Sequence, residues 1–406
     1  MKKIGLIVVL VVMFLGGQAQ APHLYEYTYP VVTEENPSIR ALMDKVVADS
    51  LEATIEHLQS YPTRRYDTKM VYEVQNWLLG QYQQLGFDSI YLHDFPLPSH
   101  LPIATTSDNV VAIQKGCLYP EEYVVCGAHY DSYNNLPGDP DSLYAPGADD
   151  NASGVSGILE TARILSKCSF ERSLIFVNFG AEEVGLIGSA AYARDCAERD
   201  MHIVGYFNLD MIGYLEEGSD IHVNLLYTTQ DSTLATFVKK FSKVYYPAMQ
   251  IWQDWLSGGD SDYSSFNRNG YPAIQVFEDT HHSSPFIHTT DDVLGVSVNN
   301  MDQAKRFTEL NLGLVATLAG LVNTSVEETD SDPLVIYPNP VTETLTIKGI
   351  PMRQVEVFNL MGQKVLNETC HEEVIRLDVA SLAAGVYVLR VLDDAMKVHT
   401  HRIVTY

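Results

Sequence analysis

Apolar runs and helically spaced apolar residues alternate through the middle of the chain. Short runs rich in Val, Ile and Phe predict strands, and longer stretches with apolar residues three or four positions apart predict helices. The predicted strands are residues 109–115, 123–128, 173–179, 203–209 and 273–277. The predicted helices are residues 39–58, 70–85, 152–165, 188–199, 234–245 and 303–322. This alternation indicates an α/β fold, a three-layer sandwich around a mostly parallel central sheet.

The pattern changes after residue 326. Residues 327–340 (EETDSDPLVIYPNP) are acidic and then contain prolines, which is typical of a linker that leads into a strand. Short β-type runs separated by turn-like breaks follow, and they predict a small C-terminal β-sandwich. These runs are residues 345–347, 354–359, 374–377, 385–392 and 398–404. We therefore expect a middle domain over 22–326, a linker over 327–332 and a β-sandwich over 333–406.

The first 21 residues have the pattern of a secretory signal peptide. Lys2 and Lys3 precede an apolar run of twelve residues, 4–15, and small residues follow at 16–21 (GGQAQA). The run is too short to cross a bilayer, so an uncleaved anchor helix is the weaker alternative. We expect export from the cytoplasm and a mature chain without a transmembrane span.

Charge narrows the function classes. The 26 basic residues are outnumbered by 52 acidic ones, which argues against nucleic acid, because phosphate binding needs basic patches. Residues 333–406 carry eight acidic and seven basic residues, so the acidic excess belongs to the middle domain. Five cysteines in 406 residues are too few for a disulfide scaffold.

Acidic and imidazole residues follow four of the predicted strands, and another acidic pair precedes the helix at 152. A lone residue of this kind is usually solvated or caps a helix. Because open α/β sheets bind ligands at the carboxyl ends of their strands, we expect this set to meet at one edge. The set comprises His129, Asp131, Asp149, Asp150, Glu182, Glu183, Asp210 and His288.

Imidazoles combined with carboxylates suit zinc or another borderline divalent metal. The set contains no cysteine, which disfavours a structural zinc site of the cysteine type. Three carboxylate ligands with one bridging hydroxide would neutralise two divalent ions, whereas a single ion would leave a net negative charge. The residues therefore favour a pair of metal ions.

The motifs around these residues resemble those of the M28 zinc aminopeptidases, in the same order along the chain. The resemblance covers roughly residues 110–322 and implies the fold of the zinc exopeptidases. The matching segments are 127–132 (GAHYDS), 146–154 (PGADDNASG), 181–186 (AEEVGL), 209–211 (LDM), 261–262 (SD), 270–273 (GYPA) and 287–290 (IHTT).

The resemblance implies roles for seven of these eight residues, all except Asp149. Asp150 is expected to bridge two Zn²⁺ ions and to be followed by a cis peptide bond. One ion would be completed by His129 and Asp210, and the other by Glu183 and His288. Asp131 would orient His129 by accepting from its free ring nitrogen.

Glu182 falls at the position of the general base. The resemblance implies that zinc acidifies a bound water and that Glu182 accepts its proton and delivers it to the leaving amine. The expected reaction is the release of N-terminal residues from peptides with a free N-terminus.

The chain departs from the family at the oxyanion-stabilising position. Some members have Tyr directly before the last ligand His, where this chain has Ile287, and others have Tyr shortly before the Ser-Asp pair, where residues 255–260 contain none. Tyr263 is only a candidate, so the oxyanion donor stays open, as do the preferred N-terminal residue and the oligomeric state.

The tail resembles the C-terminal sorting domain of proteins exported by the type IX secretion system of Bacteroidota. The matching segments are 337–340 (YPNP), 357–363 (VFNLMGQ), 382–387 (LAAGVY) and 402–404 (RIV). The resemblance implies the type IX machinery as a partner and a secreted or cell-surface protein. A carbohydrate-binding or adhesive β-module is the alternative.

Three other functions remain open. A glutaminyl cyclase-like transferase with one zinc would share residues 129–132 (HYDS). A catalytically inactive surface binding protein would not need Glu182. A carboxypeptidase relative is less consistent with the chain, which has no large insertion between the metal motifs and no clear arginine cluster.

Overall fold

The computed structural model describes residues 27–101, 106–134, 144–228, 232–254, 260–322, 334–339, 341–359, 363–383, 385–394 and 398–405. The chain forms two compact units, with the boundary after Val322. The predicted signal peptide (1–21) and linker (327–332) lie outside the described residues. Among the described residues, no helix combines the length and apolar character needed to cross a membrane.

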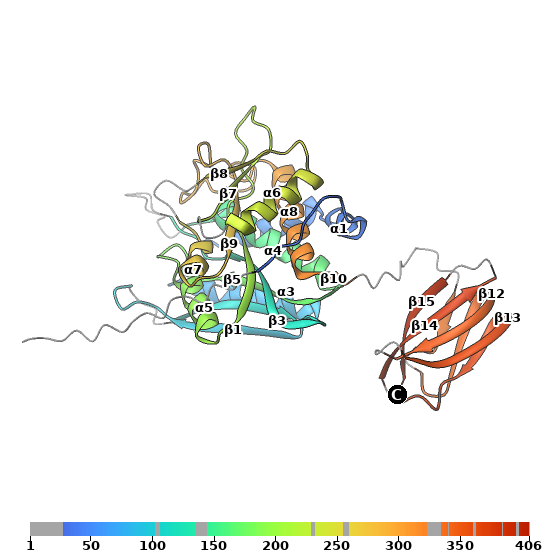
Figure 1. Cartoon of the computed structure of the whole chain (residues 1–406). Helices are drawn as coiled ribbons and strands as arrows, with labels where there is room; N and C mark the ends of the chain where they lie inside the picture. Colours follow the sequence, from blue (N-terminus) through green and yellow to red (C-terminus); the bar gives the residue numbers. More distant parts are fainter. Residues whose placement is uncertain are drawn as a thin grey trace, which may run out of the picture. The chain divides into compact units, whose positions relative to one another are not determined.

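The N-terminal unit is built from helices and strands that alternate over most of its length (Figure 1). Its strands are β1 (Ser89–Pro96), β2 (Thr106–Gln114), β3 (Tyr119–His129), β4 (Ser169–Phe170), β5 (Arg172–Phe179), β6 (His202–Leu209), β7 (Val223–Leu226), β8 (Ile251–Asp254), β9 (Ala273–Phe277) and β10 (Leu321–Val322). Its helices are α1 (Pro37–Met43), α2 (Ala48–Gln59), α3 (Met70–Leu85), α4 (Gly154–Leu165), α5 (Ile187–Glu198), α6 (Ser232–Tyr245), α7 (Tyr263–Arg268) and α8 (Met301–Ala319), with a kinked turn η1 (Ala148–Ser153) before α4.

Eight strands form the central sheet, in the order β1-β2-β5-β3-β6-β9-β7-β8. The four central strands, β5, β3, β6 and β9, are parallel to one another. Antiparallel pairing joins β1 to β2, β2 to β5, and β7 to β9. The predicted α/β fold is confirmed, and the parallel strands occupy the centre of the sheet.

Helices cover both faces of this sheet, so the predicted three layers are present (Figure 1). Successive side chains of a strand point to opposite faces. Val124 and Cys126 of β3 therefore pack in the larger core cluster with α4 and α8. Val125 packs in the opposite cluster with residues of α5 and α7, such as Tyr192 and Phe266.

The pattern missed some short elements and one helix break. The helix predicted at 39–58 is two helices, α1 and α2, because the chain turns at residues 44–47, where buried Val46 follows exposed Lys45. The strands β7 and β8 have four residues each, too few to establish a periodicity. All five cysteines are free.

The C-terminal unit is a five-stranded antiparallel, sandwich-like sheet. Its strands are β11 (Val335–Tyr337), β12 (Thr344–Phe358), β13 (Lys364–Asp378), β14 (Gly385–Asp393) and β15 (Val398–Thr405). Two predicted strands, 345–347 and 354–359, are one long strand, β12, whose pairing shifts register near Met352. Alternate apolar residues such as Leu345, Ile347 and Val355 are fully buried in its core.

Candidate metal centre

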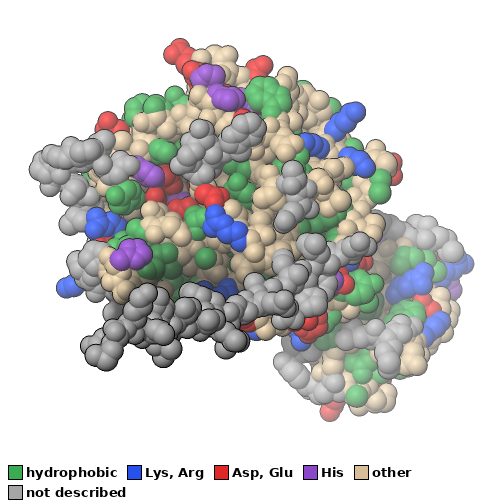
Figure 2. Space-filling view, turned by 60° about the vertical axis from the view of Figure 1, so that its left-hand side comes forward, with side chains coloured by type: hydrophobic (Ala, Val, Ile, Leu, Met, Phe, Trp, Pro, Cys, Tyr) green, Lys and Arg blue, Asp and Glu red, His purple; other side chains and the backbone are tan. Residues whose placement is uncertain are grey.

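Parallel strands bring most of the candidate residues to one edge of the sheet. His129 is the last residue of β3, and Asp210 follows the last residue of β6. Glu182 and Glu183 lie three and four residues beyond β5. Because β5, β3 and β6 are parallel neighbours, their carboxyl ends meet. On the face drawn in Figure 2, acidic and histidine side chains gather near the middle of the N-terminal unit.

Left-handed backbone conformations sit beside these residues. Ala181, Met211 and His288 have φ values of 55°, 54° and 57°, although none is glycine. Such conformations cost roughly 1–3 kcal/mol each and concentrate at functional sites. The turn η1 supplies Asp150, and the Asp150–Asn151 peptide bond is cis, as the resemblance implied.

Two groups of nitrogen and oxygen atoms meet at Asp150. Its Oδ1 lies 3.2 Å from His129 Nε2, and its Oδ2 lies 3.0 Å from His288 Nε2. His129 Nε2 is also 3.4 Å from Asp210 Oδ1. His288 Nε2 is 2.8 Å from Glu183 Oε2. The two oxygens of one carboxylate thus face two different imidazoles, each beside a further carboxylate.

This donor set fits metal ions. Ligand atoms of His129, Glu182 and Asp210 lie within 4.8 Å of one another, as do those of His129, Asp150 and Glu183. Glu183 Oε1 and Asp210 Oδ1 are buried without a hydrogen-bond partner among the described residues. Buried carboxylate oxygens without partners are costly, and a cation beside each of them would satisfy it.

The shifted pKa values of the carboxylates also indicate that the site binds positive charge. Burial raises the pKa of Asp150, but hydrogen bonds from His129 and His288 outweigh it and hold this pKa far below its usual range. Burial and the negative charge of Asp150 raise the pKa of Glu183 to about 8. Burial raises the pKa of Glu182 well above its usual value, with attraction by His129 opposing it.

The two histidines carry the complementary shift. Burial alone would lower the pKa of His288, but its bonds to Asp150 and Glu183 raise it to about 11. Burial also lowers the pKa of His129, but the negative charges of Glu182 and Asp210 outweigh it and raise this pKa well above its usual value. Without metal, therefore, protonated imidazoles take the positive charge that the carboxylates require.

Asp131 connects three of the candidate residues. Its Oδ1 accepts from the backbone N–H of Glu182 at 3.0 Å, and its Oδ2 accepts from that of Glu183 at 3.2 Å. His129 Nδ1 lies 3.2 Å from the carbonyl oxygen of Asp131 and 3.6 Å from its Oδ1. Asp131 thus orients the glutamate pair through the backbone as well as the imidazole.

Asp210 is oriented by a chain of polar groups. Ser261 donates to its Oδ2 at 2.6 Å, and Asn208 donates to the Ser261 hydroxyl at 2.8 Å. This leaves Asp210 Oδ1 directed at His129. The nearby Tyr263 opens α7, and Tyr133 packs edge-on against the His288 ring at 5.6 Å.

Sequence reasoning missed two supporting residues. Asp292 accepts from the backbone N–H groups of Asp149 and Asp150 at 2.8 and 3.1 Å, and so holds the turn that carries Asp150. Its place four residues after His288 was the only signal. Arg64 gave no signal, because its partners are backbone carbonyls, three of which are distant along the chain.

Arg64 is fully buried and ties the loops of the site together. Its guanidinium donates to the carbonyl oxygens of Tyr130 and Gly147, both at 2.7 Å, and to those of Leu58 and Pro146. Burial lowers its pKa to about 10, with Asp292 opposing the shift, so it stays charged at neutral pH.

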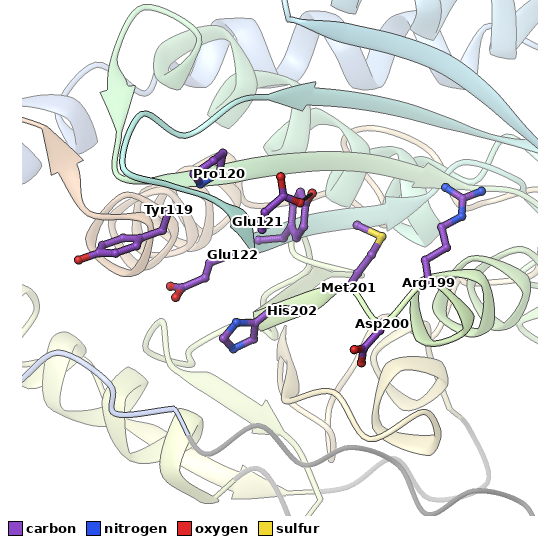
Figure 3. Close-up of a pocket in the computed structure, with 9 residues that line it drawn as sticks. Tyr119, Pro120, Glu121, Glu122, Arg199, Asp200, Met201 and His202 are labelled. Carbon is purple, nitrogen blue, oxygen red and sulfur yellow. Dashed lines mark hydrogen bonds between the residues drawn. The ribbon is translucent and has the colours of Figure 1, made fainter. Parts of the chain in front are cut away.

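A separate hollow of about 410 Å³ lies at the other end of the strands (Figure 3). It is lined at the amino ends of β3 and β6 by residues such as Tyr119, Glu122 and His202. Glu122 there pairs with Arg172 at 2.6 Å. His129 and Asp210 lie at the carboxyl ends of the same strands, so this hollow is not part of the metal centre.

Comparison with known proteins decides the family. The profile of peptidase family M28 matches residues 109–314, a span that contains the five candidate metal ligands as well as Asp131 and Glu182. The chain belongs to peptidase family M28. Membership makes it a metallo-aminopeptidase-type hydrolase.

Curated relatives of this M28 chain span most of its N-terminal unit. Leucine aminopeptidase 1 of Fusarium vanettenii is 30% identical over 310 residues, covering 72% of this chain and 75% of that protein. A probable leucine aminopeptidase of Arthroderma benhamiae is 29% identical over 293 residues, covering 69% of this chain and 75% of its own length.

Solved structures share the fold. The LapA aminopeptidase of Legionella pneumophila superposes with a TM-score of 0.61 at 24% identity, covering 73% of this chain and 78% of that one. A zinc aminopeptidase of Bacillus subtilis superposes with a TM-score of 0.56 at 18% identity, covering 68% of this chain and 96% of that one. A glutaminyl cyclase of Fimbriiglobus ruber superposes with a TM-score of 0.57 at 15% identity, covering 67% of this chain and 96% of that one.

The tail matches a second family. The profile of the secretion system C-terminal sorting domain covers residues 335–405. The predicted type IX sorting domain is therefore confirmed, and it indicates export to the cell surface or the medium.

Proposed function

We propose that this M28 peptidase is an exported dinuclear zinc aminopeptidase that releases N-terminal residues from peptides, with Glu182 as its general base. The observation that carries the proposal is the placement of Asp150, whose two oxygens face His129 and His288 separately. A carboxylate in this position suits a bridge between two ions.

The proposed ligands divide into two sets around that bridge. One zinc ion would be held by Asp150, His129 and Asp210, and the other by Asp150, Glu183 and His288. When bound, the ions would polarise the scissile carbonyl and acidify water. The carboxylates would also attract the protonated N-terminal amine of a substrate, which favours cleavage of the first peptide bond.

Glu182 is proposed to move the proton. Its side chain is about 10% exposed, and its Oε2 stands 4.0 Å from His129 Nε2, farther than the oxygens of Asp150 and Asp210. Glu182 thus lies within reach of the metal centre but farther from the imidazole than the other two carboxylates, a position that suits a group that accepts a proton from bound water. Glu182 Oε2 faces His129, whereas Glu183 Oε2 lies 2.8 Å from His288 Nε2, so the two neighbouring side chains point in different directions.

An apolar cluster beside the centre supports a preference for apolar N-terminal residues. Met211, Leu226 and Phe277 form this cluster, with Tyr263 and Ile287 packed against it. Met211 and Ile287 are the chain neighbours of Asp210 and His288. We propose that it receives a side chain such as leucine, in keeping with the names of the relatives.

Export is proposed to proceed in two steps. Removal of residues 1–21 would accompany passage from the cytoplasm, and the sorting domain would then engage the type IX machinery. We place the peptidase domain at 22–326, the linker at 327–332 and the sorting domain at 333–406.

A cyclase is the second candidate, favoured by the shared fold of the glutaminyl cyclase structure. The test is titration of metal-free protein with Zn²⁺, while leucyl-p-nitroanilide hydrolysis and pyroglutamate formation from a glutaminyl peptide are followed in parallel. We expect hydrolysis to saturate at two ions per chain. Pyroglutamate formation that saturates at one ion, without hydrolysis, would overturn the proposal.

A further inference from the structure

A second group of histidines and carboxylates, none of them a proposed ligand of the M28 centre, lies at the end of β9. Strand β7 is antiparallel to β9, with Asn224 opposite Phe277. His222, which precedes β7, and Asp279, which follows β9, therefore emerge at the same end of the pair. The turn after β9 then brings His282 back, with its backbone N–H bonded to the carbonyl oxygen of Asp279 at 3.2 Å.

One oxygen of Asp279 faces both imidazoles. Asp279 Oδ2 is 2.9 Å from His282 Nδ1 and 3.5 Å from His222 Nε2. Glu216 Oε2 lies 3.5 Å from His282 Nδ1. Two imidazole nitrogens and one or two carboxylates, without cysteine, form a donor set that zinc accepts.

His222 supplies the decisive observation. Its side chain is 10% exposed, and Nδ1 lies 2.9 Å from the carbonyl oxygen of Asp220. A carbonyl only accepts, so Nδ1 carries the hydrogen and the neutral ring has its lone pair on Nε2. That buried Nε2 has no hydrogen-bond partner among the described residues. A lone pair aimed at a carboxylate is unfavourable, and a metal ion between the two groups would turn this contact into two favourable ones.

The ring is also fixed from the side. Trp252 of β8 lies with its ring centre 4.4 Å from that of His222. A backbone carbonyl on the far nitrogen is a usual means of orienting a metal-binding histidine.

We propose that His222, Asp279 and His282 bind one Zn²⁺ ion at the surface, with Glu216 in reach as a fourth ligand. The ligand atoms are not gathered as tightly as those around Asp150. His282 and Glu216 have side chains 55% and 45% exposed, so both can rotate to complete the shell. The ion would join the start of β7 to the turn after β9, the segment that leads towards His288.

The test is zinc content per chain after equilibrium dialysis of the full-length protein against micromolar Zn²⁺. Wild type should hold one ion more than His222→Ala and His282→Ala, with turnover within twofold of wild type. His281→Ala is the matched control, because its side chain is 75% exposed and its Nε2 faces Asp254 at 3.5 Å. This control should keep the wild-type zinc content.

Equal zinc content in wild type and His282→Ala would overturn the proposal, and this exposed residue can be replaced without loss of the fold. The result is separable from the dinuclear centre. In a Glu183→Gln background, which weakens that centre, His282→Ala should still remove one further ion. If the proposed dinuclear centre is wrong but the surface site is right, His282→Ala should still lower the zinc content by one ion per chain.

Discussion

The two units of this M28 peptidase differ in how many ionisable side chains they bury together. In the N-terminal unit, His129, Asp150, Glu182 and Asp210 are all buried at one edge of a sheet. Among the described residues of the C-terminal unit, the buried acidic and basic side chains are Asp393 and His399, which lie 3.0 Å apart on adjacent strands. Both units have fully buried apolar cores.

The difference separates what folding needs from what function needs. Apolar alternation is sufficient for the sheet of the sorting domain, and most of its described ionisable side chains are exposed. Burial of several carboxylates together opposes folding unless positive charge compensates them. Their persistence at the ends of parallel strands therefore points to ligands rather than to stability.

Arg64→Met should produce the largest loss of stability. It leaves four buried carbonyl oxygens without their donor, and each such loss costs about 1–3 kcal/mol. We expect the free energy of unfolding, measured by urea titration, to fall by at least about 3 kcal/mol. Arg194→Met, which removes an exposed pair with Glu198, should change it by less than about 1 kcal/mol. Equal effects would refute the proposed role of Arg64.

Asp131→Asn should reduce activity with a smaller effect on folding. It weakens the acceptor of two backbone N–H groups and removes the charge behind His129. Changes of this kind behind a metal ligand cost about 10–100-fold in affinity or activity. Asp393→Asn is the control in the sorting domain and should leave turnover unchanged. Full activity of Asp131→Asn would break the comparison between the units.

Removal of the tail should have the smallest effect on catalysis. A chain ending near Glu328 retains every residue of the proposed centre and the whole core of the N-terminal unit. Turnover of leucyl-p-nitroanilide should stay within about twofold of that of the full chain. Loss of the general base, by comparison, should lower turnover by at least about 10²-fold. A soluble, zinc-loaded but inactive product would show that the tail belongs to the enzyme.

The sequence predicted the parts of the centre that strand ends determine. His129, Glu183 and Asp210 follow apolar runs, so their common edge was foreseeable from the α/β pattern. Arg64 and Asp292 were not, because they act on backbone groups that only the folded chain brings near. The second histidine group also escaped, since it depends on β7, a strand of four residues.

The most direct test of the central claim compares Glu182→Gln with Glu183→Gln. The first change keeps the shape of the proposed base and removes its proton acceptor, so the centre should retain its two ions while turnover falls at least about 10²-fold. The second should weaken one zinc site and lower activity through metal loss. Near-normal turnover of Glu182→Gln, or metal loss equal to that of Glu183→Gln, would contradict the account.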